Sequence, residues 1–347
     1  MWLSFCRISS PLPRQNIENG GRKCFASMYA AIYVQYSLLG LIMAGDKFLF
    51  SFVHATDFHF EAGDHPEFPE ANKRIACLVE DIKKLNLVHP LKFVILTGDL
   101  TNRGSANRDE LSSALKLCRS LPVPFYTVAG NHDLAPNRSI SAAYPGKEDY
   151  HEGSVETSGY AEIFGLHGIR FSFQAESYRF AGVSLRDGDP DGILPWLEKE
   201  IRQARSKVIL SAHYGLYPPR DAGPLYRWGF SRIGTILHRL RSIVDGESNR
   251  VVLYLYGHNH VNSVVRIGDT YHVSGGGIQR GCTGYRLFSC YENRIEGRFL
   301  LLSKPALHSF EYWGPEGCID STHENAKEYH GGNSGQESAF VMDLTGR

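Results

Sequence analysis

Five short polar clusters in this chain carry side chains of the types that can bind metal ions. Each cluster comes soon after a run of apolar residues that predicts a buried strand. In chain order the clusters are Asp57-Phe58-His59, Gly98-Asp99, Gly130-Asn131-His132-Asp133, Ala212-His213 and Gly257-His258-Asn259-His260. Carboxylate, amide and imidazole groups together suit Mn, Fe, Zn or Co better than copper(I) or an iron-sulfur cluster. The predicted metal ligands are Asp57, His59, Asp99, Asn131, His213, His258 and His260.

The spacing of the clusters favours one shared site. Asp57 and His59 are two residues apart, as are His258 and His260, so each pair can point to the same side of an extended segment. Side chains at the carboxyl ends of strands in an α/β sheet converge on one crevice. Clusters that are far apart in the sequence can therefore meet there.

The segments that must position these clusters alternate between short apolar runs and amphipathic stretches. The predicted strands are residues 48–54, 93–97, 125–128, 170–173, 178–184, 208–212, 251–256, 261–266 and 270–274. The predicted helices are residues 72–85, 109–120, 195–204 and 231–244. The first half has the β-α-β rhythm of parallel pairing, whereas the second half suggests hairpins. We expect an α/β fold in which two facing mixed β-sheets are flanked by helices, in four layers.

This pattern places the folded domain at residues 46–302. Beyond it, residues 303–347 form a tail rich in Gly, Ser, His and Glu, for which we expect no fixed structure.

Residues 1–45 stand apart from this pattern. Basic residues precede the apolar run 29–44, which is the order of a signal peptide, but the run is short for a transmembrane helix. The segment is therefore either a targeting sequence or an extension outside the fold. A cytoplasmic location is favoured, and a secretory or membrane-targeted one follows if residues 29–44 act as a signal.

Charge and composition narrow the choice of partners. The 347 residues include 37 Lys plus Arg and 37 Asp plus Glu, so the formal net charge is zero. Protein surfaces that bind nucleic acid normally carry an excess of basic residues. The balanced charge of this chain therefore gives no strong nucleic-acid signature. The seven cysteines form no C-x-x-C pair, which argues against a zinc ribbon. The sequence shows no clear membrane anchor and leaves the oligomeric state open.

The five clusters resemble, in order, the motifs of the calcineurin-like metallophosphoesterases: D-x-H, G-D, G-N-H-D/E, a lone His and G-H-x-H. The resemblance spans residues 48 to 274. It implies a division of the ligands, with Asp57, His59 and His260 on one metal ion, Asn131, His213 and His258 on the other, and Asp99 bridging the two.

The resemblance also implies a mechanism. Two metal ions would hold the phosphoryl oxygens and lower the pKa of a bridging water, which attacks phosphorus as hydroxide. Asp99 is therefore expected to be catalytic, and Asn131 to help bind the substrate. His132 looks like the family's catalytic histidine, which contacts the phosphate and protonates the leaving oxygen.

One block departs from a related pattern. Residues 98–104 resemble the G-D-x-x-D-R-G block of Ser/Thr protein phosphatases, but Asn102 stands where those enzymes have the Asp that orients the catalytic histidine. Asp133 is a candidate substitute partner for His132. Arg103 is a predicted substrate contact through its planar fork, with simple solvation as the alternative.

The expected function is metal-dependent hydrolysis of a small phosphate mono- or diester. The L-T-x-x-G block after Gly98-Asp99 looks like the class III cyclic-nucleotide phosphodiesterase branch. The alternatives are a protein or nucleotide phosphatase of the same superfamily, or a non-catalytic binding scaffold on the same fold. The complete ligand set with His132 favours an enzyme. The glycines at 275–277 lack the frame of a nucleotide-binding loop, so we expect a turn there, placed to line the metal pocket.

Overall fold

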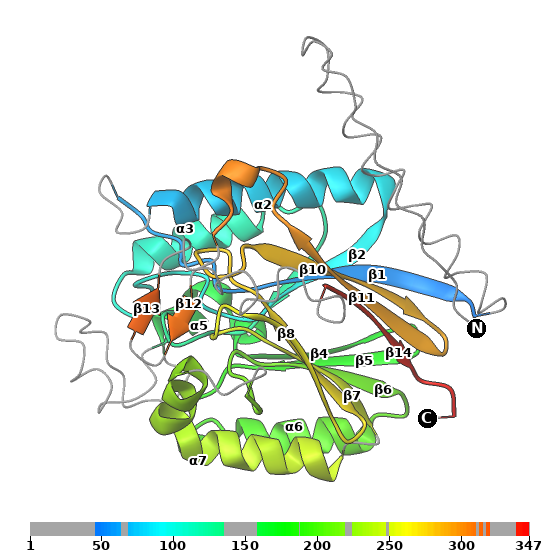
Figure 1. Cartoon of the computed structure of the whole chain (residues 1–347). Coiled ribbons are helices and arrows are strands. Elements are labelled where there is room, and N and C mark those ends of the chain that lie inside the picture. Colours follow the sequence, from blue (N-terminus) through cyan, green and yellow to red (C-terminus); the bar gives the residue numbers. More distant parts are fainter. Residues whose placement is uncertain are drawn as a thin grey trace, which may run out of the picture. The chain divides into compact units, whose positions relative to one another are not determined.

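Two mixed β-sheets of six strands each form the centre of this computed structural model (Figure 1). The first sheet has the strand order β14 (Ala339–Asp343), β11 (Arg294–Leu301), β10 (Gly284–Tyr291), β1 (Phe48–Ala55), β2 (Leu91–Leu96) and β3 (Phe125–Thr127). The second has the order β4 (Arg170–Ala175), β5 (Tyr178–Val183), β6 (Lys207–Ser211), β7 (Val251–Tyr256), β9 (Thr270–Gly275) and β8 (Asn262–Ile267). Strands β12 (Tyr312–Gly314) and β13 (Gly317–Ile319) pair separately.

The structure describes residues 46–63, 69–134, 158–186, 188–218, 224–247, 250–309, 312–314, 317–319 and 338–346. The chain divides into the units Met1–Asp46 and Lys47–Arg347, and apart from Asp46 the described residues belong to the second. The predicted extension or targeting segment at residues 1–45 lies outside the described residues. No helix in the described ranges combines the length and apolar character needed to cross a membrane.

Helices cover the outer face of each sheet (Figure 1). On the first sheet lie α2 (Pro69–Val88) and α3 (Arg108–Cys118), where Ile75, Leu78 and Ile82 of α2 share a buried cluster with Val53 and Val94. On the second lie α6 (Ile193–Gln203) and α7 (Pro224–Gly246), and the short α5 (Gly159–Phe164) joins the same cluster. These helices bury one face each because their apolar residues recur at helical spacing.

A layer of aromatic side chains fills the space between the sheets. Phe50 and Phe52 of β1 point into it together with Phe93, Phe180 and Phe288. Phe52 stacks on Phe288 with ring centroids 4.8 Å apart. Since side chains alternate along a strand, Val53 and Ala55 of β1 face the helices instead. The predicted fold, with two facing mixed sheets between helical layers, is confirmed.

Strands β10 and β11 were not among the predicted strands, although β10 pairs with β1 at the centre of the first sheet. The sequence of β10 did not suggest a buried strand because it contains a charged residue, Arg286. In the structure Arg286 is fully buried. The Arg286 guanidinium donates to the carbonyl of Ser274, at 3.0 Å, and to the side chain of Asn262. The polarity of a residue in the sequence does not reveal that the fold will supply these hydrogen-bond partners.

The prediction that residues 303–347 lack fixed structure is wrong for the last described segment. Strand β14 pairs antiparallel with β11, and Met342 and Leu344 are fully buried between the sheets. The Leu344 backbone is bound on both sides, since its N–H donates to the Asn293 carbonyl and its carbonyl accepts from Lys207 Nζ. A five-residue strand is too short for its alternating pattern to stand out in a polar tail.

The paired β14 predicts a stability effect at the end of the chain. Met342→Ala should lower the free energy of unfolding by about 2–5 kcal/mol, because it empties space in the layer between the sheets. Val341→Ala on the opposite, exposed face of the same strand should cost less than about 1 kcal/mol. Urea unfolding of both variants measures the difference. Equal, small effects would show that β14 is not docked.

Candidate metal centre

All five polar clusters lie just beyond the carboxyl ends of parallel strands. Asp57, Asp99 and Asn131 follow β1, β2 and β3 of the first sheet, while His213 and His258 follow β6 and β7 of the second. Strands β1, β2 and β3 are parallel to one another, as are β6 and β7. The clusters therefore meet at one edge where the two sheets face each other.

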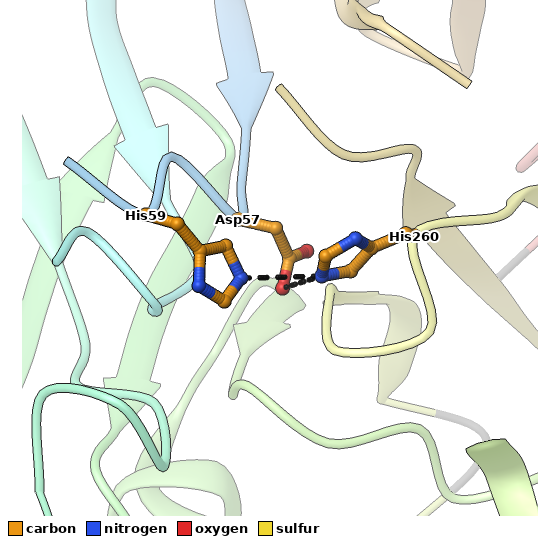
Figure 2. Close-up of side chains that lie close together, drawn as sticks. All are labelled: Asp57, His59 and His260. Carbon is orange, nitrogen blue, oxygen red and sulfur yellow. Dashed lines mark hydrogen bonds and ion pairs between the residues drawn. The ribbon is translucent and has the colours of Figure 1, made fainter. Parts of the chain in front are cut away.

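The first group of side chains contains Asp57, His59 and His260 (Figure 2). His260 Nε2 lies 3.3 Å from Asp57 Oδ1 and 3.2 Å from His59 Nε2. The three ligand atoms lie within 4.8 Å of one another, and all three residues are buried. One oxygen and two ring nitrogens thus lie close enough together to hold one metal ion.

The second group centres on Asp99. Its Oδ2 atom lies 3.2 Å from His213 Nε2 and 3.6 Å from His59 Nε2, so one carboxylate oxygen faces both groups. His258 joins Asp99 and His213 within 4.8 Å, and Asn131 Oδ1 lies 3.2 Å from His213 Nε2. The structure therefore brings all seven predicted ligands together, with Asp99 between the two sets.

Backbone groups of other clusters orient the carboxylates. The His258 N–H donates to both oxygens of Asp57 at 3.0 Å, and the His132 N–H donates to Asp99 Oδ1 at 2.8 Å. His213 Nδ1 lies 2.8 Å from the Thr97 carbonyl, so this nitrogen donates and Nε2 is left to face Asp99. A second hydrogen bond of this kind is typical of a metal-binding histidine. It supports the assignment of His213 as a metal ligand, although its sequence cluster, Ala212-His213, is short.

The backbone at the centre is strained. Five of the seven predicted ligands have positive φ without being glycine: Asp57, His59, Asp99, His258 and His260, with φ between 48° and 68°. This left-handed conformation is uncommon for residues with a Cβ atom. Strain of this kind concentrates at functional sites, where the surrounding structure holds it in place.

Two glycines let the backbone approach the carboxylates. A Cβ atom at Gly130 would overlap Asp99 Oδ1, and one at Gly257 would overlap Thr56 Oγ1 and lie 2.5 Å from Asp57 Oδ2. A larger residue at either position would displace a carboxylate. These glycines are therefore required by contact with the predicted ligands.

Burial and mutual charge set the protonation of the centre. Burial holds the pKa of His59 and of His258 well below the usual range, and neighbouring histidines add to this effect, so both rings stay neutral. Burial opposes ionisation of Asp99, but His213 and His132 hold its pKa well below the usual range. Burial also disfavours the charged form of His213, but the Asp99 carboxylate more than offsets this and raises the pKa of His213 to about 9. The Asp99 carboxylate thus favours positive charge at the position of the His213 ring.

His132 is oriented by a backbone carbonyl and not by a carboxylate. Its Nδ1 lies 2.8 Å from the Asn102 carbonyl oxygen. The Asn102 side chain instead donates to Glu61 Oε1 at 2.6 Å, and Glu61 is buried. The side-chain amide of Asn72 brackets the Glu61 backbone, accepting from its N–H and donating to its carbonyl. Glu61 thus holds Asn102, and Asn102 positions His132.

The suggestion that Asp133 could substitute as the partner of His132 is wrong. The buried Asp133 carboxylate accepts hydrogen bonds from the backbone N–H groups of Leu100, Thr101 and Gly130 and from the Thr101 hydroxyl. Burial and the nearby Asp99 charge raise the pKa of Asp133 to about 6. Asp133 therefore joins the loops after β2 and β3, the two loops that carry Asp99 and His132.

The remaining predicted residue, Arg103, lies next to Asn102 and is exposed. Its backbone N–H donates to Glu110 Oε2 at 2.7 Å, and its contact with substrate stays a prediction. Sequence reasoning missed Glu61 and Thr97. Glu61 is two residues beyond His59 in the same segment, and this spacing was the available signal.

The close approach at Gly257 predicts a loss of metal binding. Gly257→Ala should push the Asp57 carboxylate aside and weaken metal binding by at least about 10-fold, as changes beside a ligand commonly do. Gly246→Ala, at the end of α7 where a Cβ atom meets nothing within 4 Å, is the matched control. Metal content after dialysis, measured by mass spectrometry, compares the two. Equal metal retention would contradict the close contact.

The Glu61–Asn102 hydrogen bond predicts that introducing the Asp of the Ser/Thr phosphatases at position 102 lowers stability and activity. Asn102→Asp should place two buried carboxylates together, destabilise the fold by about 1–3 kcal/mol and lower kcat. Glu61→Gln combined with Asn102→Asp restores a donor to the pair and should recover part of both losses. Thermal unfolding and kcat of the single and double variants form the test. Full activity and stability of Asn102→Asp alone would contradict the hydrogen bond between the side chains of Asn102 and Glu61.

Three comparisons relate this chain to known proteins. The calcineurin-like phosphoesterase family matches residues 50–262, which is more than half of the chain. A probable glycerophosphodiester phosphodiesterase GpdQ from Arcobacter nitrofigilis is 27% identical over 176 residues. That match covers 50% of this chain and 59% of the relative, so the chain spans less than two thirds of the relative's length.

Solved structures share the fold. A dimetal phosphatase from Danio rerio superposes with a TM-score of 0.51 at 13% identity, covering 73% of this chain and 96% of that one. GAP50, the anchor in the inner membrane complex of Plasmodium, superposes with a TM-score of 0.50 at 15% identity, covering 74% and 86%. Likenesses at this identity show the fold alone. Together with the match over residues 50–262, they lead to one conclusion: the chain belongs to the calcineurin-like phosphoesterase family.

Proposed function

We propose that the chain is a phosphoesterase that depends on two metal ions. The observation that carries this proposal is the position of Asp99, whose Oδ2 atom faces His59 on one side and His213 on the other. A carboxylate oxygen between two sets of ligands is what a pair of ions requires. The family match supports the same chemistry.

The residues present fit such ions. Buried oxygen and ring-nitrogen atoms converge in two groups, and the donor set suits Mn, Fe, Zn or Co. We assign one ion to Asp57, His59 and His260, the other to Asn131, His213 and His258, and Asp99 to both. When bound, the two ions supply positive charge for the phosphoryl oxygens and a water molecule of lowered pKa.

Besides the metal ligands, the chain provides an oriented proton donor, His132. With Nδ1 of His132 donating to the Asn102 carbonyl, Nε2 is the nitrogen that can pass a proton to the leaving oxygen. The His132 ring lies against His59, with centroids 4.5 Å apart, so it borders the centre. Asn131 and His132 are partly exposed while the other six predicted ligands are buried. Substrate therefore enters on the side of these two residues.

We propose a phosphodiester as the substrate class. The relative that matches half of this chain is named as a probable glycerophosphodiester phosphodiesterase, and this name supports a diester. A cyclic nucleotide is one member of this class, as the sequence block after Asp99 suggested. Phosphomonoesters of proteins or nucleotides are the alternative, and they differ by carrying a second negative charge on the phosphate.

Activity measurements test the proposal. The Mn²⁺-loaded protein should hydrolyse bis(p-nitrophenyl) phosphate faster than p-nitrophenyl phosphate. Asp99→Ala should abolish the activity and release metal. His132→Ala should lower kcat by about 10²–10⁴-fold and keep its metal, since its assigned role is proton transfer.

Two results would contradict these assignments. Activity that survives Asp99→Ala would remove the bridging carboxylate from the mechanism. Loss of metal in His132→Ala would make His132 a ligand, in line with its closeness to His59 and Asp99. A metal-loaded protein with no activity on either ester, nor on cyclic nucleotides, would favour the binding scaffold.

A further inference from the structure

The loop after β9, residues 276–283, lies against both parts of the first ligand group. The Gln279 N–H donates to the Asp57 carbonyl at 2.9 Å, and the Ile278 N–H donates to the Thr56 carbonyl at 3.2 Å. On the other side, the Cys282 N–H donates to the His260 carbonyl at 3.2 Å. The loop therefore bridges the clusters that hold Asp57 and His260.

Glycines let this loop come so close. A Cβ atom at Gly277 would lie 2.9 Å from the His260 ring, and one at Gly281 would lie 2.7 Å from His260 Cβ. Gly281 also has a φ of +80°, which a larger residue rarely adopts. The glycine-rich run expected to form a turn beside the pocket thus packs directly on a predicted ligand.

The loop is also anchored from behind. Ile278 is fully buried in the cluster under α2. Arg74 of α2 donates to the carbonyls of Gln279 and Leu307, so its guanidinium fixes the loop through the backbone. The backbone on both sides of Arg280 is therefore held in place before any ligand arrives.

Arg280 sits at the tip of this anchored loop. Its neighbours Gln279 and Gly281 contact Asp57 and His260, and the residue itself is half-buried. These backbone contacts place Arg280 beside the first ligand group.

We propose that Arg280 binds an anionic oxygen of the substrate's phosphoryl group at the Asp57, His59 and His260 side of the centre. This inference rests on the proposed phosphoesterase function. Two ions and two carboxylates offer limited positive charge, and a fixed arginine adds one more with a planar fork that matches phosphate oxygens. Arg280 then strengthens the binding of a phosphate dianion more than that of a diester monoanion, because the attraction scales with charge.

Inorganic phosphate is a suitable probe because it needs no turnover. Calorimetric titration of phosphate into the full-length, Mn²⁺-loaded protein should show about 10- to 100-fold weaker binding for Arg280→Gln than for wild type, the loss typical of a charged hydrogen bond. Metal content should be unchanged. Arg266→Gln, an exposed arginine in the β8–β9 hairpin, is the matched control and should bind as wild type does.

Turnover gives a second readout. Arg280→Gln should lower kcat/KM for p-nitrophenyl phosphate more than for bis(p-nitrophenyl) phosphate. Phosphate binding within twofold of the Arg266→Gln control would overturn the proposal. So would an equal loss for both esters, because that would indicate a general disturbance of the site.

If Arg280→Gln loses metal or fails to fold, Arg280→Lys decides the question. Lysine keeps the charge but not the fork, so this variant should hold its metal and bind phosphate about 3- to 10-fold more weakly than wild type. Unchanged affinity would overturn the proposal. Failure of the phosphoesterase function itself would appear differently, as a wild-type protein that binds phosphate through Arg280 but hydrolyses neither ester.

Discussion

Asp99 places a buried carboxylate where the two sheets meet, and a buried charge is costly unless it is paired. Imidazoles surround it on both sides, and its pKa stays well below the usual range despite burial. Positive charge beside Asp99 is therefore needed to stabilise its buried carboxylate. Asp99 raises the pKa of His213 to about 9, and metal ions bound by these ligands would supply the same positive charge.

The fold meets this requirement through the direction of its strands. Parallel strands in both sheets end at the same edge, so five loops deliver ligands to one place. The loops then hold one another: His258 orients Asp57, His132 orients Asp99, and Thr97 orients His213. These contacts, and the close packing at Gly130 and Gly257, stabilise the left-handed backbone conformations of the ligands.

Much of this could be predicted from the sequence because the signals are local. Apolar runs that end in ligand-type residues predicted β1, β2, β7 and the clusters after them, and their convergence follows from strand direction. The missed elements depend on distant contacts. Strand β10 is concealed by Arg286, whose partners Ser274 and Asn262 lie in the other sheet.

The same distinction explains the errors at the site. Position 102 suggested that a carboxylate was missing beside His132, and Asp133 was the nearest replacement in sequence. In the structure a backbone carbonyl of Asn102 takes that role, which no residue pattern can reveal. Glu61 acts one step further away, through the Asn102 side chain.

The central claim is that Asp99 joins two metal ions, and electron paramagnetic resonance of the protein loaded with two equivalents of Mn²⁺ tests it most directly. Two ions about 3.5–4 Å apart that share a bridging ligand should give the spectrum of a spin-coupled pair. In Asp99→Ala this coupling should disappear. A six-line spectrum of isolated Mn²⁺ from the fully loaded wild-type protein would contradict the account.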